Sequence, residues 1–207
     1  MIAIIDYGAG NLRSVARAFA RLGYPARITS DPQDVLQAHA LVLPGVGAAA
    51  DAIDSLRTLH LIEPIRQAVA ERKPFFGVCL GLQVLFDASE EGGYHRCLGL
   101  LPGVVRRLPP GLKVPHMGWN QVSQRISHPL FNGIAEGANF YFVHSFYADV
   151  EDTALVAGET EYQGFRFPSV LIRGTLVATQ FHPEKSGDTG LRLYENWCRQ
   201  IYENWCG

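Results

Sequence analysis

The most informative stretch of the sequence is Pro74-Phe-Phe-Gly-Val-Cys79-Leu-Gly81-Leu-Gln83-Val-Leu-Phe86. A short apolar run reaches a cysteine between two glycines, with the spacing G-x-C-x-G, and a helical pattern follows at once. This is the thiol counterpart of the nucleophile elbow, a sharp turn from a strand into a helix. The positive end of such a helix favours a thiolate. The stretch therefore predicts Cys79 as a nucleophile, although a cysteine in an apolar run is also an ordinary core residue.

Composition places the chain among globular proteins. Its 207 residues are 47% hydrophobic and 18% charged, which is enough for one α/β domain with a core. The formal net charge of −2 argues against nucleic-acid binding. No apolar stretch has membrane-spanning length, and the start lacks a signal-peptide pattern. The four cysteines have no C-x-x-C spacing, so we expect a reduced, cytoplasmic protein with neither a metal nor a cofactor.

Strand and helix patterns alternate in the first half. Asn11 is expected to cap a helix that ends before Gly23, and Asp31 a short helix that begins with Pro32. The remaining expected elements are strands at 2–5, 25–29 and 40–43, the strand before Cys79, and helices at 48–58 and 61–72. This alternation predicts an α/β fold: a flavodoxin-like, doubly wound, mostly parallel central sheet flanked by helices.

The second half changes to short strands, which predicts an additional antiparallel β section within one domain spanning residues 1–207. Strands are expected at 103–107, 114–123, 139–148, 154–160, 165–172 and 175–182, with a small helix near 128–133 and a closing helix at 188–202. The sequence Tyr-Glu-Asn-Trp-Cys occurs at 194–198 and again at 202–206. The two copies do not share a helix face, and we assign the repeat no function.

Glycine-rich loops follow two of the expected parallel strands, at 6–10 and 44–47, on the sheet edge where α/β proteins place their sites. The first loop begins like a dinucleotide-binding fingerprint. Arg13 stands where that fingerprint needs its third glycine, so we reject a dinucleotide site.

A base for Cys79 is expected in Gln180-Phe-His182-Pro-Glu184-Lys-Ser186. Proline biases His182 towards an extended backbone, in which residues two apart point the same way. The Glu184 carboxylate can then orient the His182 ring, which is the logic of a Cys-His-Glu triad. Of the other histidines, His116 and His144 lie in strand patterns and are expected to be structural.

These two motifs resemble those of the class I, triad-type glutamine amidotransferases. Three further stretches, at 4–14, 113–120 and 141–145, resemble the glutaminase subunits of imidazole glycerol phosphate synthases. The resemblance implies hydrolysis of L-glutamine to L-glutamate and ammonia through a glutamyl thioester. The ammonia passes to a cyclase subunit, a (β/α)₈ barrel, which makes imidazole glycerol phosphate and AICAR in histidine biosynthesis.

The resemblance also implies roles for individual residues. The oxyanion donors are expected from the N–H of Leu80 and from the loop Gly45-Val46-Gly47. Gln83, His144 and Ser145 are expected to bind the substrate. The expected heterodimer interface with the cyclase contains Asn11, Arg17, Met117, Trp119, Asn120 and Lys185. Trp119 could instead be a core aromatic residue, since a tryptophan in a strand is usually buried.

Alternatives remain at this point. The nearest is the glutaminase subunit of another class I amidotransferase, such as anthranilate synthase or pyridoxal phosphate synthase. Others are an elbow-type cysteine peptidase or hydrolase, and a non-catalytic regulatory subunit. The complete triad argues against the last of these. Because uncoupled hydrolysis wastes glutamine, we expect low activity without the partner.

Overall fold

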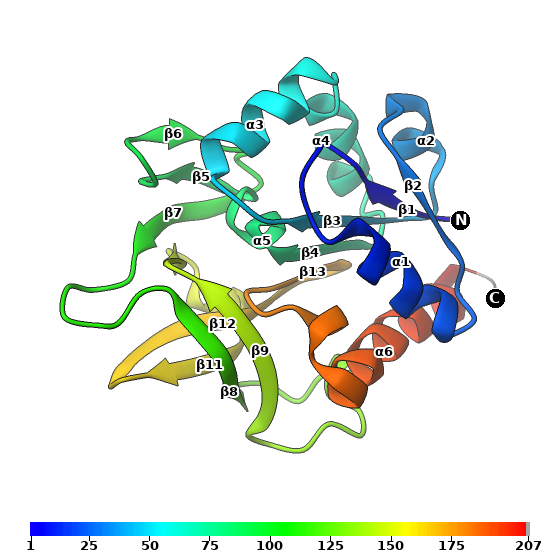
Figure 1. The fold of residues 1–207 in the computed structure, drawn as a ribbon. Coiled ribbons are helices and arrows are strands. Elements are labelled where there is room, and N and C mark those ends of the chain that lie inside the picture. The colour runs from blue at the N-terminus through cyan, green and yellow to red at the C-terminus, as the bar shows by residue number, and fades with distance from the viewer. Residues whose placement is uncertain (206–207) are drawn as a thin grey trace.

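A computed structural model describes the backbone of residues 1–205 and the side chains of residues 1–201 (Figure 1). One large sheet runs through the described part of the molecule. From edge to edge its strands are β2 (Ala26–Thr29), β1 (Ile2–Ile5), β3 (Ala40–Gly45), β4 (Phe75–Cys79), β13 (Leu176–Thr179), β12 (Phe165–Arg173), β11 (Val156–Tyr162), β8 (His116–Gln124) and β9 (Ala138–His144).

The sheet has a parallel part and an antiparallel part that meet at β13. The strands β2, β1, β3, β4 and β13 pair in parallel, in the order of a flavodoxin-like sheet. From β13 onward β12, β11, β8 and β9 pair antiparallel. The predicted α/β class is confirmed, and the antiparallel section continues the same sheet.

Helices cover both faces of the parallel part (Figure 1). One face carries α1 (Leu12–Arg21) and α6 (Gly187–Trp205). The other carries α2 (Pro32–Gln37), α3 (Ala49–Thr58) and α4 (Ile62–Ala70). Strand side chains alternate between the two cores: Ile2 and Ile4 of β1 pack on the α1–α6 side, while Ala3 and Ile5 pack on the opposite side.

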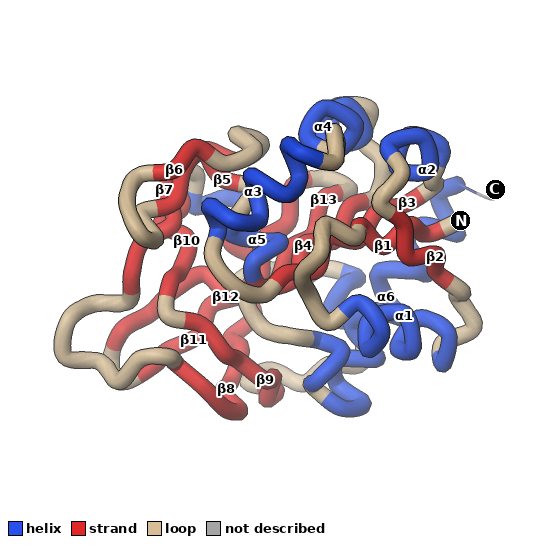
Figure 2. The backbone as a smooth tube through the Cα atoms, turned by 45° about the horizontal axis from the view of Figure 1, so that its top comes forward, coloured by secondary structure: helices blue, strands red, loops and turns tan. Residues whose placement is uncertain are grey.

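A second, four-stranded sheet was not expected from the sequence. Its order is β10 (Phe146–Val150), β7 (Leu101–Arg107), β5 (Phe86–Ser89) and β6 (His95–Arg96), and Figure 2 shows it beside α3 and α5 (Leu80–Gln83). The strand expected at 139–148 therefore breaks at Ser145, with β9 in the large sheet and β10 in the small one. Likewise, the helix after Cys79 makes a single turn before the chain enters β5.

The predicted side-chain cap is present at the start of α2 and absent at the start of α1. The Asp31 side chain accepts a hydrogen bond from the N–H of Gln33 at the start of α2, as predicted. The prediction for Asn11 is wrong, because its side chain makes no capping hydrogen bond to α1. Its amide instead points at Glu184, with Nδ2 3.4 Å from Oε1.

Three short 3₁₀ turns complete the described elements: η1 (Pro129–Phe131), η2 (Thr153–Leu155) and η3 (Pro183–Lys185). The strand expected at 175–182 ends at Thr179, which leaves the His-Pro-Glu motif free to form η3. Within residues 1–205, no helix is long and apolar enough to cross a membrane. The first copy of the pentapeptide repeat lies in α6; the side chains of the second copy fall outside the described residues.

Candidate active site

The elbow expected at Cys79 is present. Cys79 has φ 54° and ψ −105°, a backbone conformation that side-chain-bearing residues rarely adopt, and it joins β4 directly to α5. The turn is so tight that a Cβ on Gly81 would lie 1.8 Å from the carbonyl oxygen of Leu43. Glycine at position 81 is therefore required for the elbow to pack against β3.

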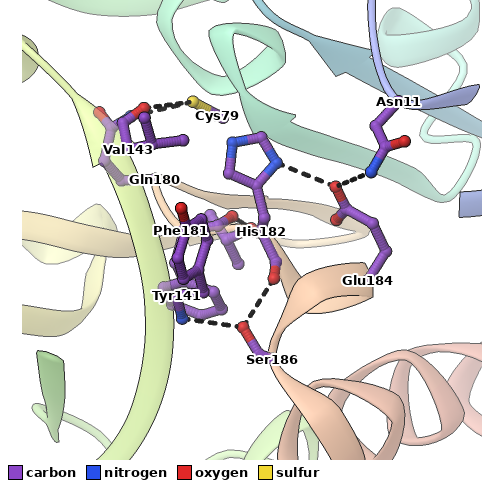
Figure 3. Close-up of polar contacts among 10 residues, drawn as sticks. Asn11, Cys79, Tyr141, Val143, Gln180, Phe181, His182, Glu184 and Ser186 are labelled. Atoms are coloured by element: carbon purple, nitrogen blue, oxygen red, sulfur yellow. Dashed lines mark hydrogen bonds and ion pairs between the residues drawn. The ribbon is translucent and has the colours of Figure 1, made fainter. Parts of the chain in front are cut away.

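His182 reaches the same sheet edge because β13 is the parallel neighbour of β4. Its Nδ1 lies 2.9 Å from Oε1 of Glu184, and the two side chains are only 2% and 1% exposed. The backbone is fixed as well: the N–H of His182 donates to the carbonyl of Tyr141, and Ser186 Oγ donates to the carbonyl of His182 (Figure 3). The structure thus brings together all three predicted triad residues.

The charges around His182 favour its protonated form. Burial opposes protonation, but the hydrogen bond to Glu184 and the interactions with the negative charges of Cys79 and Glu184 raise the pKa of His182 to about 10. The buried Nε2 makes no hydrogen bond of ordinary geometry to the described residues, and the charge of Cys79 acts on the ring. An imidazolium held between a sulfur and a carboxylate is the arrangement that activates a cysteine nucleophile.

Two further groups contact the sulfur. Gln180 donates from Nε2 to Cys79 Sγ at 3.7 Å, and the thiol lies 3.8 Å from the carbonyl oxygen of Val143 (Figure 3). Gln180 is fully buried, and its Oε1 accepts a hydrogen bond from Gln83 Nε2 at 3.2 Å. Sequence reasoning gave Gln180 no role of its own, although the residue stands inside the histidine motif.

A pocket of about 290 Å³ opens beside Cys79. Of the residues expected at the site, it is lined by Val46, Gly47, Cys79, Leu80, Gln83, His144 and Ser145. It is also lined by Glu91, Pro115, Val143 and Phe146, which the sequence did not single out. Glu91 is the carboxylate of this lining, and its Oε2 accepts a hydrogen bond from the N–H of Ala49. The pocket is small and mixed in polarity, as expected for a small polar ligand.

The loop after β3 lies against the elbow. Gly45 pairs in register with Cys79, and a Cβ on Gly45 would meet Tyr7 Oη at 2.4 Å and Leu80 Cβ at 2.8 Å. Tyr7 is buried below the loop. Burial and the charge of Cys79 both raise the pKa of its hydroxyl. The missing side chain at position 45 is therefore what lets the loop approach Leu80.

A buried histidine pair connects the pocket with β8. Nδ1 of His144 lies 2.9 Å from the carbonyl oxygen of Phe146, so this nitrogen carries the proton and Nε2 accepts. His116 Nδ1 is 2.9 Å from that Nε2 and must donate to it. Asn120 Nδ2 then donates to His116 Nε2 at 3.2 Å and to the carbonyl of Glu161 at 2.9 Å. The hydrogen-bond pattern assigns both rings as neutral.

Electrostatics agree with that assignment. Burial lowers the pKa of His116 to about 4. Burial also lowers the pKa of His144, to about 3, against a smaller opposing effect of its hydrogen bond to Phe146. The prediction that these histidines are structural agrees with the hydrogen bonds, and His144 additionally lines the pocket.

The expected interface residues lie on several elements. Met117 and Trp119 of β8 are 62% and 59% exposed, so Trp119 is not a core residue. The Trp119 ring packs edge-on against Tyr141, over which the Lys185 ammonium lies at 5.8 Å. Asn120 belongs to the histidine network, Asn11 contacts the triad carboxylate, and Arg17 is exposed on α1.

Among the residues that the structure describes, no group of three or more His, Cys, Asp or Glu side chains is placed to hold a metal ion. Cys79, His182 and Glu184 place a sulfur, an imidazole ring and a carboxylate together at the elbow (Figure 3).

Comparison with known proteins identifies the class that this fold and triad define. A family model described as glutamine amidotransferase class-I matches residues 3–201, and the chain belongs to that family. The solved structure of PurLQS from Thermotoga maritima superposes with a TM-score of 0.75 at 18% identity, covering 97% of this chain and 98% of that one. This likeness concerns the fold.

Close relatives define the particular subfamily. The chain is 55% identical to the imidazole glycerol phosphate synthase subunit HisH of Dehalococcoides mccartyi strain CBDB1, covering 95% of this chain and 96% of the relative. It is 52% identical to the HisH subunit of Chloroflexus aurantiacus, covering 96% and 95%. The chain therefore belongs to the HisH subunits of imidazole glycerol phosphate synthase, glutamine amidotransferases of histidine biosynthesis.

Proposed function

We propose that this chain hydrolyses L-glutamine through Cys79, His182 and Glu184 and delivers the ammonia to a cyclase subunit. The observation that carries the proposal is the buried His182–Glu184 pair beside a cysteine on a nucleophile elbow. Glu184 keeps the proton on Nδ1 of His182, so that Nε2 exchanges protons with the sulfur and the substrate.

In the first half of the reaction, the Cys79 thiolate attacks the side-chain amide carbon of glutamine. The electron pair of the C=O bond moves to oxygen. The His182 imidazolium then gives its proton to the amide nitrogen as the C–N bond breaks, which releases ammonia and leaves a γ-glutamyl thioester. In the second half His182 takes a proton from water, the hydroxide attacks the thioester, and glutamate leaves as the thiolate forms again.

The tetrahedral oxyanions require donors on the elbow side of the pocket. We assign one to the N–H of Leu80, directly after the nucleophile, and the other to the loop Gly45-Val46-Gly47. The close approach of Gly45 to Leu80 supports this assignment. Because Gly45 has no side chain, the backbone of the loop lies directly against the elbow.

The pocket lining supports a binding mode for the amino-acid end of glutamine. Glu91 supplies a carboxylate for the substrate ammonium, and Ser145 lies at the break between β9 and β10. The side-chain amide nitrogen of Gln83 donates hydrogen bonds to the carbonyl of Phe146 and to Gln180. The amide oxygen Oε1 is therefore the atom of Gln83 that can accept a hydrogen bond from the substrate. His144 is neutral and holds the carbonyl of Phe146 in place.

The partner in this proposal is a cyclase with a (β/α)₈ barrel, in a heterodimer formed in the cytoplasm. The exposed Met117 and Trp119, with Lys185 close by over Tyr141, supply the apolar and cationic groups that suit such an interface. Asn11, Arg17 and Asn120 lie at its margin. The three described cysteines are free thiols, which fits a reducing compartment.

Glutamate release tests the proposal. The purified chain is assayed with glutamine alone and with the cyclase plus the cyclase's nucleotide substrate. We expect strong stimulation by the partner, no activity for Cys79→Ala, and unchanged activity for Cys97→Ala, which removes another buried thiol. No release by a folded, partner-bound wild-type chain would contradict the proposal.

A further inference from the structure

Tyr194 of α6 is a fully buried tyrosine beneath the triad. Its ring lies 4.7 Å from the Phe19 ring of α1 and 5.1 Å from the Phe76 ring of β4, measured between centroids. These contacts account for the apolar part of the side chain. The hydroxyl is also buried, and a buried hydroxyl requires a hydrogen-bond partner.

Helix α6 approaches the η3 turn that carries Glu184 unusually closely. A Cβ on Gly190 would lie 2.0 Å from the carbonyl oxygen of Pro183, so that only glycine fits there. Tyr194 stands one helical turn after Gly190, on the same face of α6. The close contact at Gly190 therefore brings the Tyr194 side chain to the carboxylate that follows Pro183.

Two buried oxygens lie at this contact, Oε2 of Glu184 and Oη of Tyr194, and neither has a hydrogen-bond partner among the described residues. Oε1 of Glu184 is occupied by His182 Nδ1 and Asn11 Nδ2, whereas Oε2 is buried and makes no hydrogen bond of ordinary geometry to the described residues. The same holds for Tyr194 Oη. Burial raises the pKa of Tyr194, and the nearby negative charges of Glu184 and Cys198 raise it further. The hydroxyl therefore keeps its proton and remains a donor.

We propose that Tyr194 is a positioning residue of the triad, whose hydroxyl donates to Glu184 Oε2 while His182 and Asn11 occupy Oε1. This inference rests on the proposed role of Glu184. The carboxylate is then held from three elements: the start of α1, the η3 turn and α6. The Tyr194 hydrogen bond stabilises the charged carboxylate and fixes the rotamer in which Oε1 faces the His182 ring.

Tyr194→Phe tests this directly, in the full chain bound to its cyclase partner. We expect kcat for glutamine hydrolysis to fall about tenfold with KM unchanged, because Tyr194 touches the triad and not the pocket. Without the donor, the Glu184 carboxylate holds the His182 ring in place less firmly. The acidic limb of the pH profile for Cys79 alkylation by iodoacetamide should therefore move up by about half a pH unit.

Asn196→Ala is the matched control on the same helix. Asn196 is also buried, and it donates to the carbonyls of Leu130 and Asn132, on the side of α6 that faces η1. This variant should lower the thermal stability without altering kcat or the alkylation profile. If the two variants changed the kinetics alike, Tyr194 would act only by docking α6, and the inference would be overturned.

A site-specific 3-fluorotyrosine at position 194 covers the case in which Tyr194→Phe does not fold. Fluorine makes the hydroxyl a stronger donor at nearly constant volume, so the acidic limb should move to lower pH. An unchanged profile in either variant would overturn the inference. These outcomes can be distinguished from a failure of the proposed function. A wild-type complex that releases no glutamate would refute the glutaminase activity. An active wild-type complex whose Tyr194 variants have the same kinetics and the same pH profile would refute only the role of Tyr194.

Discussion

Gln83 and Gln180 form a hydrogen-bonded pair at the nucleophile, in which Gln83 Nε2 donates to Gln180 Oε1 at 3.2 Å. This bond turns the Gln180 amide nitrogen towards Cys79 Sγ, 3.7 Å away. Gln83 donates its second N–H to the carbonyl of Phe146, which also accepts from His144. A continuous chain of hydrogen bonds through the buried side chains of Gln180 and Gln83 thus connects the Cys79 sulfur with the pocket.

We predict that Gln180→Leu slows alkylation of Cys79 at neutral pH several-fold, because the thiolate loses a donor while the core keeps its volume. The measurement is the rate of iodoacetamide incorporation at Cys79, followed by mass spectrometry. Gln67→Leu, at an exposed position of α4, serves as the control and should leave the rate unchanged. Equal rates in all three proteins would show that Gln180 does not stabilise the sulfur.

Gly81→Ala should destabilise the fold severely. The new methyl group meets a backbone carbonyl of β3, which cannot move without breaking the sheet. We expect a loss of about 3 kcal/mol or more in the free energy of unfolding. Gly158→Ala is the comparison: the nearest atoms to its Cβ would belong to the side chains of Val122 and Val170, at 3.0 Å, and it should cost less. Urea titration of both variants measures their free energies of unfolding and shows which substitution is the more destabilising.

Stability should decrease on the acid side because His116 and His144 are buried as neutral rings. Their folded-state pKa values, about 4 and about 3, lie below the unfolded value near 6.5. The unfolded chain therefore takes up protons first, and the free energy of unfolding falls as the pH drops from about 6.5 towards about 4. His116→Gln should flatten this dependence. A slope identical to that of the wild type would contradict the neutral assignment.

His182 changes the pH dependence of stability in the opposite direction to His116 and His144. Its folded pKa of about 10 lies above the unfolded value. Its contribution to stability is complete below pH ~6.5 and is lost as the pH rises to about 10. The difference in unfolding free energy between the wild type and His182→Asn should therefore shrink over this range, as measured by denaturant titration at a series of pH values. A constant difference would exclude a protonated His182.

Trp119→Ala should weaken the complex with the cyclase about tenfold or more while leaving the isolated chain folded. The side chain is 59% exposed, so its removal costs little stability, whereas exposed tryptophans often carry much of an interface's affinity. Calorimetric titration measures the affinity. Tyr94→Ala, at a 69% exposed aromatic residue in the loop before β6, is the control and should bind normally. Equal affinities for both variants would place the interface elsewhere.

The sequence was sufficient for features that depend on short-range patterns. The glycine spacing around Cys79 predicted the elbow, and alternating strands and helices predicted the parallel sheet. The strand at 175–182 was expected in the antiparallel section, whereas β13 pairs in parallel with β4 and so brings His182 beside Cys79. The spacing of His182 and Glu184 was equally informative, because two residues separated by a proline have few ways to face each other.

Other features depend on contacts between distant segments. Asn11 has the residue type and position of a helix cap, yet its amide serves Glu184, which lies far away in the chain. The break at Ser145 was invisible because a half-buried alternating pattern is the same in either sheet. Gln180 and Tyr194 look like ordinary core-lining residues until β13 and α6 are placed against β4.

The covalent state of Cys79 during turnover shows whether this residue is the nucleophile of the reaction. The partner-bound chain is mixed with glutamine, quenched in acid within a turnover, digested and analysed by mass spectrometry. The proposed mechanism predicts a glutamyl group on the peptide that contains Cys79, absent in Cys79→Ala. Glutamine hydrolysis that persists in Cys79→Ala, or that proceeds with the acyl group on another residue, would contradict it.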